Sequence, residues 1–242
     1  MGNLVSRSEL LDALNLLDDY LSGGFRRDRP ALAEGEQDSL DVVPEAPSGA
    51  VPEAPSGVSS DDLEAVAKEA AACTLCGLHA GRTRVVAGEG PRDAVLMLVG
   101  EAPGEEEDRT GRPFVGASGQ YLDQWLQSIE LQRGSCYIAN CLKCRPPQNR
   151  DPQAEELEAC RPLLDRQIRA LAPRAILCLG RVAAQALLHS KATIGELRSR
   201  QHAMGGIPVF VTYHPSAVLR DPALRRPVWE DLKKLKAFLG QG

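Results

Sequence analysis

Apolar residues gather in four short runs between residues 94 and 213, and each run has the length of one buried strand. The pattern predicts strands at 94–99, 137–142, 175–179 and 209–213. Between and after these runs, apolar residues recur at helical spacing, which predicts helices at 118–129, 152–171, 181–188 and 227–239. Strands that alternate with helices indicate an α/β fold, in which a parallel sheet carries helices on both faces.

The first sixty residues follow a different pattern. An amphipathic helix is predicted within residues 1–24 from leucines at helical spacing: Leu10, Leu11, Leu14, Leu17 and Leu21. This helix either packs on its own domain or binds a partner from a tether. Residues 25–60 have no periodicity and contain the tandem repeat VPEAPSGA–VPEAPSGV, which predicts a disordered linker because such residues bury little apolar surface. A capped helix at 59–73 then opens the folded domain, which we place at 61–242.

The net charge of −5 comes from the N-terminal part of the chain. Residues 1–59 carry 4 basic and 11 acidic side chains, whereas residues 60–242 carry 24 basic and 22 acidic ones. The predicted domain is therefore nearly neutral, and local basic patches that bind nucleic acid remain compatible with the sequence. No apolar run approaches the roughly 20 residues that cross a bilayer, and no signal pattern opens the chain, so we expect a cytoplasmic protein without a membrane partner.

Seven cysteines are many for a cytoplasmic protein, where disulfides are rare and thiols more often bind metals or act in catalysis. Cys73 and Cys76 form a CxxC pair, and Cys144 and Cys160 follow later. Asp151 is the predicted N-cap of the helix that carries Cys160, and the loop with Cys144 can fold back toward it. Four thiolates of this kind can hold zinc or an iron–sulfur cluster, and their spacing is compatible with both. The other three cysteines lie in or beside strand-like runs and are expected to be buried apolar residues: Cys136, Cys141 and Cys178.

Unusual sequences follow three of the four predicted strands: GEAPG, NCLKCRPP and HPS. In parallel sheets, ligands bind at the carboxyl ends of the strands. The glycines of GEAPG let the backbone approach a ligand closely because they have no Cβ. Phe114, a little further along, is either a core residue or a stacking surface for a flat ring. Glu101 and the acidic run 105–108 are either solvated or include a general base that is held inward.

Polar side chains at the second and fourth strand ends also have two interpretations each. The amide of Asn140 can read a nucleobase edge, or it can close a turn. Lys143, Arg145 and Arg150 either contact phosphates or face solvent. His214 can donate a hydrogen bond to developing negative charge, or it can be structural. The coincidence of all three strand-end motifs favours a ligand site.

Three segments together resemble the signature blocks of the family 4 uracil-DNA glycosylases: GEAPGEEEDRTGRPFVG, NCLKCRPPQNRDP with Cys160, and TYHPSAVLR. The resemblance covers residues 63–239. It implies a three-layer α/β/α fold with a central four-stranded parallel sheet and a 4Fe–4S cluster, and thus favours iron–sulfur over zinc. The cluster ligands that it implies are Cys73, Cys76, Cys144 and Cys160.

The resemblance also implies roles for the site residues. Phe114 would stack on a uracil flipped out of DNA, Asn140 would read its polar edge, and His214 would stabilise the uracil anion as the N-glycosidic bond breaks. Residues 215–220, which include Ser216, would press into the duplex where the base leaves. Three positions would line the pocket with backbone amides: Glu101, Ala102 and Gly104.

The acid that positions the attacking water is less clearly marked. Ala102 stands where the best-known family of uracil-DNA glycosylases has an aspartate, so we name Glu101 and Glu107 as alternatives. A covalent variant of the superfamily has a basic insertion after the asparagine motif. Here RPPQNRDP runs directly into the helix with Cys160, which disfavours that variant.

The expected activity is that of a monofunctional uracil-DNA glycosylase, acting as a monomer on single- or double-stranded uracil-containing DNA in base-excision repair. Its N-terminal helix would then contact a repair or replication protein. Two other classes of function are alternatives: a non-catalytic iron–sulfur protein that binds uracil or damaged DNA, and an iron–sulfur redox or polymerase-associated protein.

Overall fold

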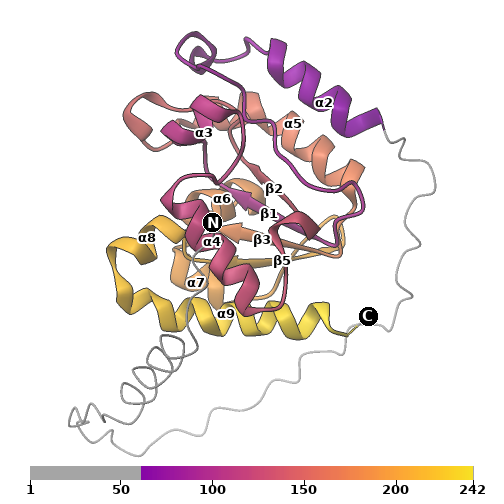
Figure 1. Ribbon diagram of the computed structural model, residues 1–242, viewed down its shortest axis with the longest axis vertical. Coiled ribbons are helices and arrows are strands. Elements are labelled where there is room, and N and C mark those ends of the chain that lie inside the picture. The colour runs from indigo at the N-terminus through magenta and orange to yellow at the C-terminus, as the bar shows by residue number, and fades with distance from the viewer. Residues whose placement is uncertain (1–60, 242) are drawn as a thin grey trace, which may run out of the picture. The chain divides into compact units, whose positions relative to one another are not determined.

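The computed structural model describes residues 61–241 (Figure 1). The predicted helix at 1–24 and linker at 25–60 lie outside these residues. The described elements are, in order, α2 (Asp61–Ala72), η1 (Gly77–Ala80), β1 (Leu96–Gly100), α3 (Glu105–Thr110), α4 (Ala117–Ser128), η2 (Arg133–Ser135), β2 (Cys136–Asn140), η3 (Pro147–Asn149), α5 (Ala154–Leu171), β3 (Ala175–Leu179), α6 (Arg181–Leu188), α7 (Ile194–Ser199), β4 (His202–Met204), β5 (Ile207–Thr212), α8 (Pro215–Arg220), η4 (Pro222–Leu224) and α9 (Arg225–Leu239).

A five-stranded sheet with the order β2-β1-β3-β5-β4 forms the centre of the fold. The four predicted strands are confirmed and pair in parallel, whereas β4 pairs antiparallel with β5 at the edge. The prediction of four strands missed β4 because it has only three residues, none of them buried. Gly205 and Gly206, with φ of 57° and 84°, form the two-residue turn between β4 and β5, as such hairpin turns require.

Side chains alternate between the two faces of the sheet, and each face packs against its own helices. On β1, Met97 and Val99 join a core that includes residues of α5 and α6. Leu96 and Leu98 point the other way, into a core that includes residues of α4 and α9. Figure 1 shows α5 and α9 on opposite sides of the strands, and the expected three-layer arrangement is confirmed. Cys136, Cys141 and Cys178 are buried in these cores, as predicted.

The predicted helices are also present, and their ends differ from the predicted ones by at most two residues. Helix α5 begins at Ala154, not at residue 152, and Asp151 is not its N-cap. Gln153 is the N-cap, and its backbone N–H donates to the carboxylate of Glu156 at 2.8 Å. Three helices of six residues each were not predicted, because a helix of that length shows no clear periodicity: α3, α7 and α8.

A third, smaller core lies between α2 and α5. It contains Val66 and Ala70 of α2, Leu163 of α5, and the two buried cysteines Cys144 and Cys160. Within residues 61–241, no helix is long and apolar enough to span a membrane.

Candidate functional site

The carboxyl ends of β1 and β2 bring together two of the predicted site residues. Gly100, the last residue of β1, pairs with Asn140, the last residue of β2. A Cβ on Gly100 would lie 2.3 Å from Oδ1 of Asn140 and 2.5 Å from Cζ of Phe114, distances that real Cβ atoms do not show. The absence of a Cβ on Gly100 therefore leaves room for the Asn140 amide and the Phe114 ring at the end of β1.

Asn140 has an unsatisfied acceptor. The residue is 1% exposed, and its Oδ1 accepts no hydrogen bond from any described residue. Buried polar atoms are nearly always paired, and leaving one unpaired costs roughly 1–3 kcal/mol. An unpaired acceptor beside Gly100 at a strand end is suited to accept a hydrogen bond from a ligand.

Phe114 lies near Asn140 and near His214, the histidine that follows the fourth predicted strand. Its ring centroid is 5.7 Å from that of His214, and the two planes make an angle of 35°. The residue is 6% exposed and also packs in the core that contains α4 and α9. Its backbone has φ of 50°, a left-handed conformation that is unusual for an aromatic residue. Phe114 is therefore a core residue whose ring lies beside His214, and its role as a stacking surface for a flat ring stays a prediction.

His214 follows β5 and caps the N-terminus of α8. Its Nδ1 accepts the backbone N–H of Ser216 at 3.1 Å and lies 2.8 Å from the Ser216 Oγ. Because Nδ1 is an acceptor, the ring proton of the neutral imidazole is on Nε2. Burial, assisted by the positive charge of Arg220 and opposed by Glu107, lowers the pKa of His214 to about 4. At neutral pH the site therefore holds a neutral imidazole with one donor.

The backbone around His214 is also closely packed. Gly180, at the end of β3, has φ of 95°, and a Cβ there would lie 3.0 Å from the Cβ of His214. A side chain at position 180 would therefore push against the histidine. This glycine was not predicted as a site residue, although its place directly after a strand was a signal that could have identified it.

The two acidic candidates differ sharply. Glu101 makes no side-chain hydrogen bond or ion pair within residues 61–241, and burial, with a contribution from Asp151, raises its pKa to about 7. Arg181 opposes this shift. By contrast, the Glu107 carboxylate accepts hydrogen bonds from the backbone N–H groups of three residues: Gly104 at 3.1 Å, Val115 at 2.8 Å and Gly116 at 3.0 Å. The backbone N–H of Gly104 is thus already paired, while Ala102 is half-buried beside Glu101.

The structure contradicts the prediction that Lys143 contacts phosphate or solvent. Its side chain is fully buried, and Nζ donates to the backbone oxygen of Asn140 at 2.8 Å and to Oε1 of Gln167 at 2.6 Å. The lysine thus holds the end of β2 from inside. Arg150 is paired with Glu156, so its charge is already neutralised.

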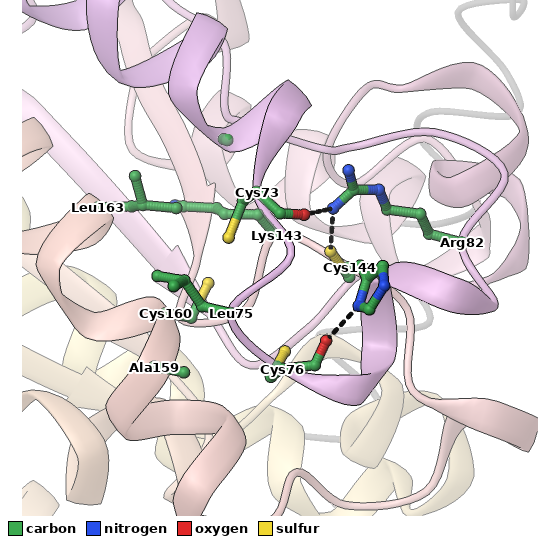
Figure 2. A pocket seen from close by; sticks show the side chains of 11 residues that line it. Cys73, Leu75, Cys76, Arg82, Lys143, Cys144, Ala159, Cys160 and Leu163 are labelled. Carbon is green, nitrogen blue, oxygen red and sulfur yellow. Dashed lines mark hydrogen bonds between the residues drawn. The ribbon is translucent and has the colours of Figure 1, made fainter.

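The four cysteines predicted to bind a metal line one cavity (Figure 2). Cys73 and Cys76 come from the segment after α2, Cys144 from the loop after β2, and Cys160 from α5. In Figure 2 their sulfur atoms surround the same space. Arg82 donates to Cys144 Sγ at 3.3 Å and to the Cys73 backbone oxygen at 2.9 Å. Among the described residues, no three histidine, cysteine or acidic side chains lie close enough to bind a single metal ion.

The chain is similar to proteins of known family. A family model described as "Uracil DNA glycosylase superfamily" matches residues 87–233. A type-4 uracil-DNA glycosylase of Pyrobaculum aerophilum is 46% identical over 178 residues, which cover 70% of this chain and 89% of the relative. One of Thermotoga maritima is 44% identical over 181 residues, or 73% of this chain and 94% of the relative.

A type-5 uracil-DNA glycosylase of Thermus thermophilus is more distant, at 32% identity over 196 residues, which cover 64% of this chain and 87% of the relative. The type-4 proteins thus match a larger share of this chain at higher identity. The match to the family model spans both strand ends that form the site and the histidine after β5. The chain belongs to the uracil-DNA glycosylase superfamily, and within it to the type-4 enzymes.

Proposed function

We propose that the protein is a monofunctional uracil-DNA glycosylase that removes uracil from DNA and leaves an abasic site. Membership of the superfamily supports this class of reaction. The observation that carries the proposal is the unpaired, buried Oδ1 of Asn140, which lies beside Phe114, and the Phe114 ring in turn lies 5.7 Å from that of His214. A base inside a duplex cannot reach such a pocket, so the enzyme must extrude it, at an energetic cost of a few kcal/mol.

Uracil recognition follows from the polar edge of the base. Its N3–H would donate to Oδ1 of Asn140, and its O4 would accept from the amide nitrogen. Cytosine presents an acceptor at N3 and a donor at the neighbouring amino group, so the same amide orientation leaves both pairs mismatched. The ring of Phe114 would stack on the base and hold it in the pocket.

His214 would act on the charge that develops during bond cleavage. When the bond between C1′ of the sugar and N1 of uracil breaks, its electron pair stays with the base and the negative charge spreads to O2. The Nε2–H of the neutral His214 would donate to that oxygen, while Ser216 keeps Nδ1 paired. A well-placed donor of this kind contributes about 3 kcal/mol to transition-state stabilisation.

Water completes the reaction at C1′, and we assign Glu101 to position it. Its carboxylate makes no other hydrogen bond within the described part of the chain, whereas Glu107 is committed to three backbone N–H groups. As the water oxygen bonds to C1′, its proton passes to the carboxylate of Glu101. Because the sugar already carries positive character, a weak base is sufficient for this step.

We further propose that the cysteine cavity holds a 4Fe–4S cluster. The four residues fit the chemistry, because such clusters are bound by four thiolates and Arg82 donates toward one of the sulfurs. Four thiolates can also bind zinc, and the relation of the chain to the type-4 enzymes is what favours the cluster. When bound, the cluster would cross-link the segment after α2, the loop after β2 and α5.

The cluster assignment can be tested separately from the enzyme activity. Anaerobically purified protein is expected to contain about four iron atoms per protein molecule and to absorb broadly in the visible range. Cys160→Ser should lower the iron content and the thermal unfolding midpoint. A colourless parent protein that contains zinc would contradict the assignment without affecting the proposal about Asn140.

Glycosylase activity is tested with labelled oligonucleotides that contain a single uracil, in single- and double-stranded form. After incubation and alkali treatment, we expect cleavage at the uracil position and none in the matched thymine oligonucleotide. Intact uracil-containing DNA would reject the proposal. Tight binding to uracil-containing DNA with no cleavage would instead indicate a non-catalytic binding protein.

A further inference from the structure

The guanidinium group of Arg133 donates hydrogen bonds to two carboxylates and two backbone oxygens that lie around it. The side chain, 21% exposed, starts from η2, just before β2. Its Nε and Nη2 donate to Glu89 at 3.2 Å and 2.8 Å, and Nη1 donates to Asp123 at 3.2 Å. The remaining donors go to backbone oxygens: Nη1 to that of Phe114 at 2.9 Å, and Nη2 to that of Pro113. All five N–H donors of the guanidinium are therefore paired.

Those two backbone oxygens flank a strained residue. Phe114 has φ of 50°, a conformation that persists in a non-glycine residue only where its surroundings enforce it. Arg133 binds the carbonyl side of this turn, and Glu107 binds the N–H groups of Val115 and Gly116 on the other side. Gly119 closes the arrangement from α4, because a Cβ there would lie 1.8 Å from the Phe114 oxygen.

The main anchor of Arg133 is itself fixed to β2. The backbone N–H of Glu89 donates to the oxygen of Ile138 at 2.9 Å, and Ile138 N–H donates back at 2.7 Å. Hydrogen bonds therefore run from Ile138 of β2 to Glu89, from Glu89 to Arg133, and from Arg133 to the backbone of Phe114. Because β2 ends at Asn140, these bonds connect the strand that carries the Asn140 amide to the residue that carries the aromatic ring.

We propose that Arg133 is a positioning residue that holds Phe114 in its left-handed conformation over the uracil pocket and so sets the affinity for the base. This inference rests on the proposed function. Arg133 does not touch the base; it acts through the backbone of Phe114. Lysine cannot replace it, because one ammonium group cannot span two adjacent carbonyl oxygens and two carboxylates in a fork.

The test is inhibition by free uracil, which reports on the pocket alone and does not require base flipping. For Arg133→Lys, which keeps the charge, we expect the inhibition constant of free uracil to rise about tenfold. A variant that is merely less stable has a smaller folded fraction and an unchanged inhibition constant. Asp123→Asn, which weakens one anchor, should raise the constant less and serves if Arg133→Lys does not fold.

Arg161→Lys is the matched control. Helix α5, which carries Arg161, packs on the face of the sheet opposite to the core that contains Phe114. The Arg161 side chain is 19% exposed, pairs with Asp165 and donates to the backbone oxygens of Ala186 and Leu187. It should lower the unfolding midpoint and leave inhibition by uracil unchanged, with iron content measured in all variants. A parent-like inhibition constant in Arg133→Lys, with an active parent, would overturn the positioning role. An inactive parent would instead overturn the proposed function.

Discussion

Glu101 and Glu107 lie in the same acidic segment and have the same side chain, yet their environments give them different chemistry. Glu107 is bound to three backbone N–H groups and holds the loop in shape. Glu101 is partly buried without a hydrogen-bonding partner among residues 61–241, and its pKa is raised to about 7. Within residues 61–241, the Glu101 carboxylate is therefore the one of the two that is free to position a water molecule.

The raised pKa of Glu101 predicts a pH dependence. A base must be deprotonated to accept the proton of water, so the cleavage rate should rise with pH through an apparent pKa near 7. Glu101→Gln should be slower and should lose this rising limb. A rate profile measured from pH 5 to 9 in single-turnover conditions checks both expectations, and an unchanged limb in the variant would contradict the assignment.

The raised pKa of Glu101 also affects the free energy of unfolding, which should fall as pH rises, whereas the cleavage rate should increase. Since the folded-state pKa of Glu101 lies above its ordinary value of 4.5, folding favours the protonated form. The stability associated with this proton is fully present below pH 4.5 and is lost as pH rises to about 7. Glu101→Gln should therefore reduce the loss of stability over this interval, which urea unfolding at several pH values can measure.

The roles proposed for Asn140 and His214 can be tested by truncation. Asn140→Ala removes the unpaired acceptor, and His214→Ala removes the proposed donor to the developing anion. Each should slow uracil removal by more than about tenfold while the protein stays folded. For Asn140→Ala, removal of an unpaired buried atom should not lower the unfolding midpoint greatly, so circular dichroism melting is the control. Parent-like rates in both variants would show that the site has been misplaced.

Strand ends and short helices bring together the residues of the proposed uracil site. The sheet places Gly100 of β1 beside Asn140 of β2, and His214, after β5, is the N-cap of α8. Gly100→Ala should therefore displace Asn140 or Phe114 and lower the rate by at least about tenfold. Gly195→Ala in α7 is the control, since the new Cβ would lie near only the side-chain Oγ1 of Thr193, at 4.0 Å. Equal rates in the two variants would show that the Gly100 contact is unimportant.

The predictability of these elements follows their length and spacing. Four buried strands and the long helices were predicted because they repeat a clear apolar pattern, and the three strand-end motifs marked Asn140, Phe114 and His214. The edge strand β4 and the six-residue helices lacked such a pattern. The sequence did not indicate the role of Arg133, because its hydrogen bond to the backbone oxygen of Phe114 joins residues that are distant in sequence. The prediction for Lys143 was wrong, because its burial beside the backbone oxygen of Asn140 leaves no pattern in the sequence.

For the whole molecule, the site and the cysteine cavity both lie within residues 61–241. A chain that lacks residues 1–60 should therefore keep nearly all of its activity on short uracil-containing oligonucleotides. Steady-state rates and unfolding midpoints of the two chains check this expectation. An inactive shortened chain would show that the N-terminal part belongs to the catalytic unit.

The most direct test of the central claim is to measure free uracil and abasic sites together after incubation of the full-length protein with uracil-containing DNA. The proposed reaction predicts that each abasic site appears with one free uracil, that thymine-containing DNA gives neither, and that Asn140→Ala and His214→Ala release uracil far more slowly. Binding of uracil-containing DNA without release of the base would contradict the claim.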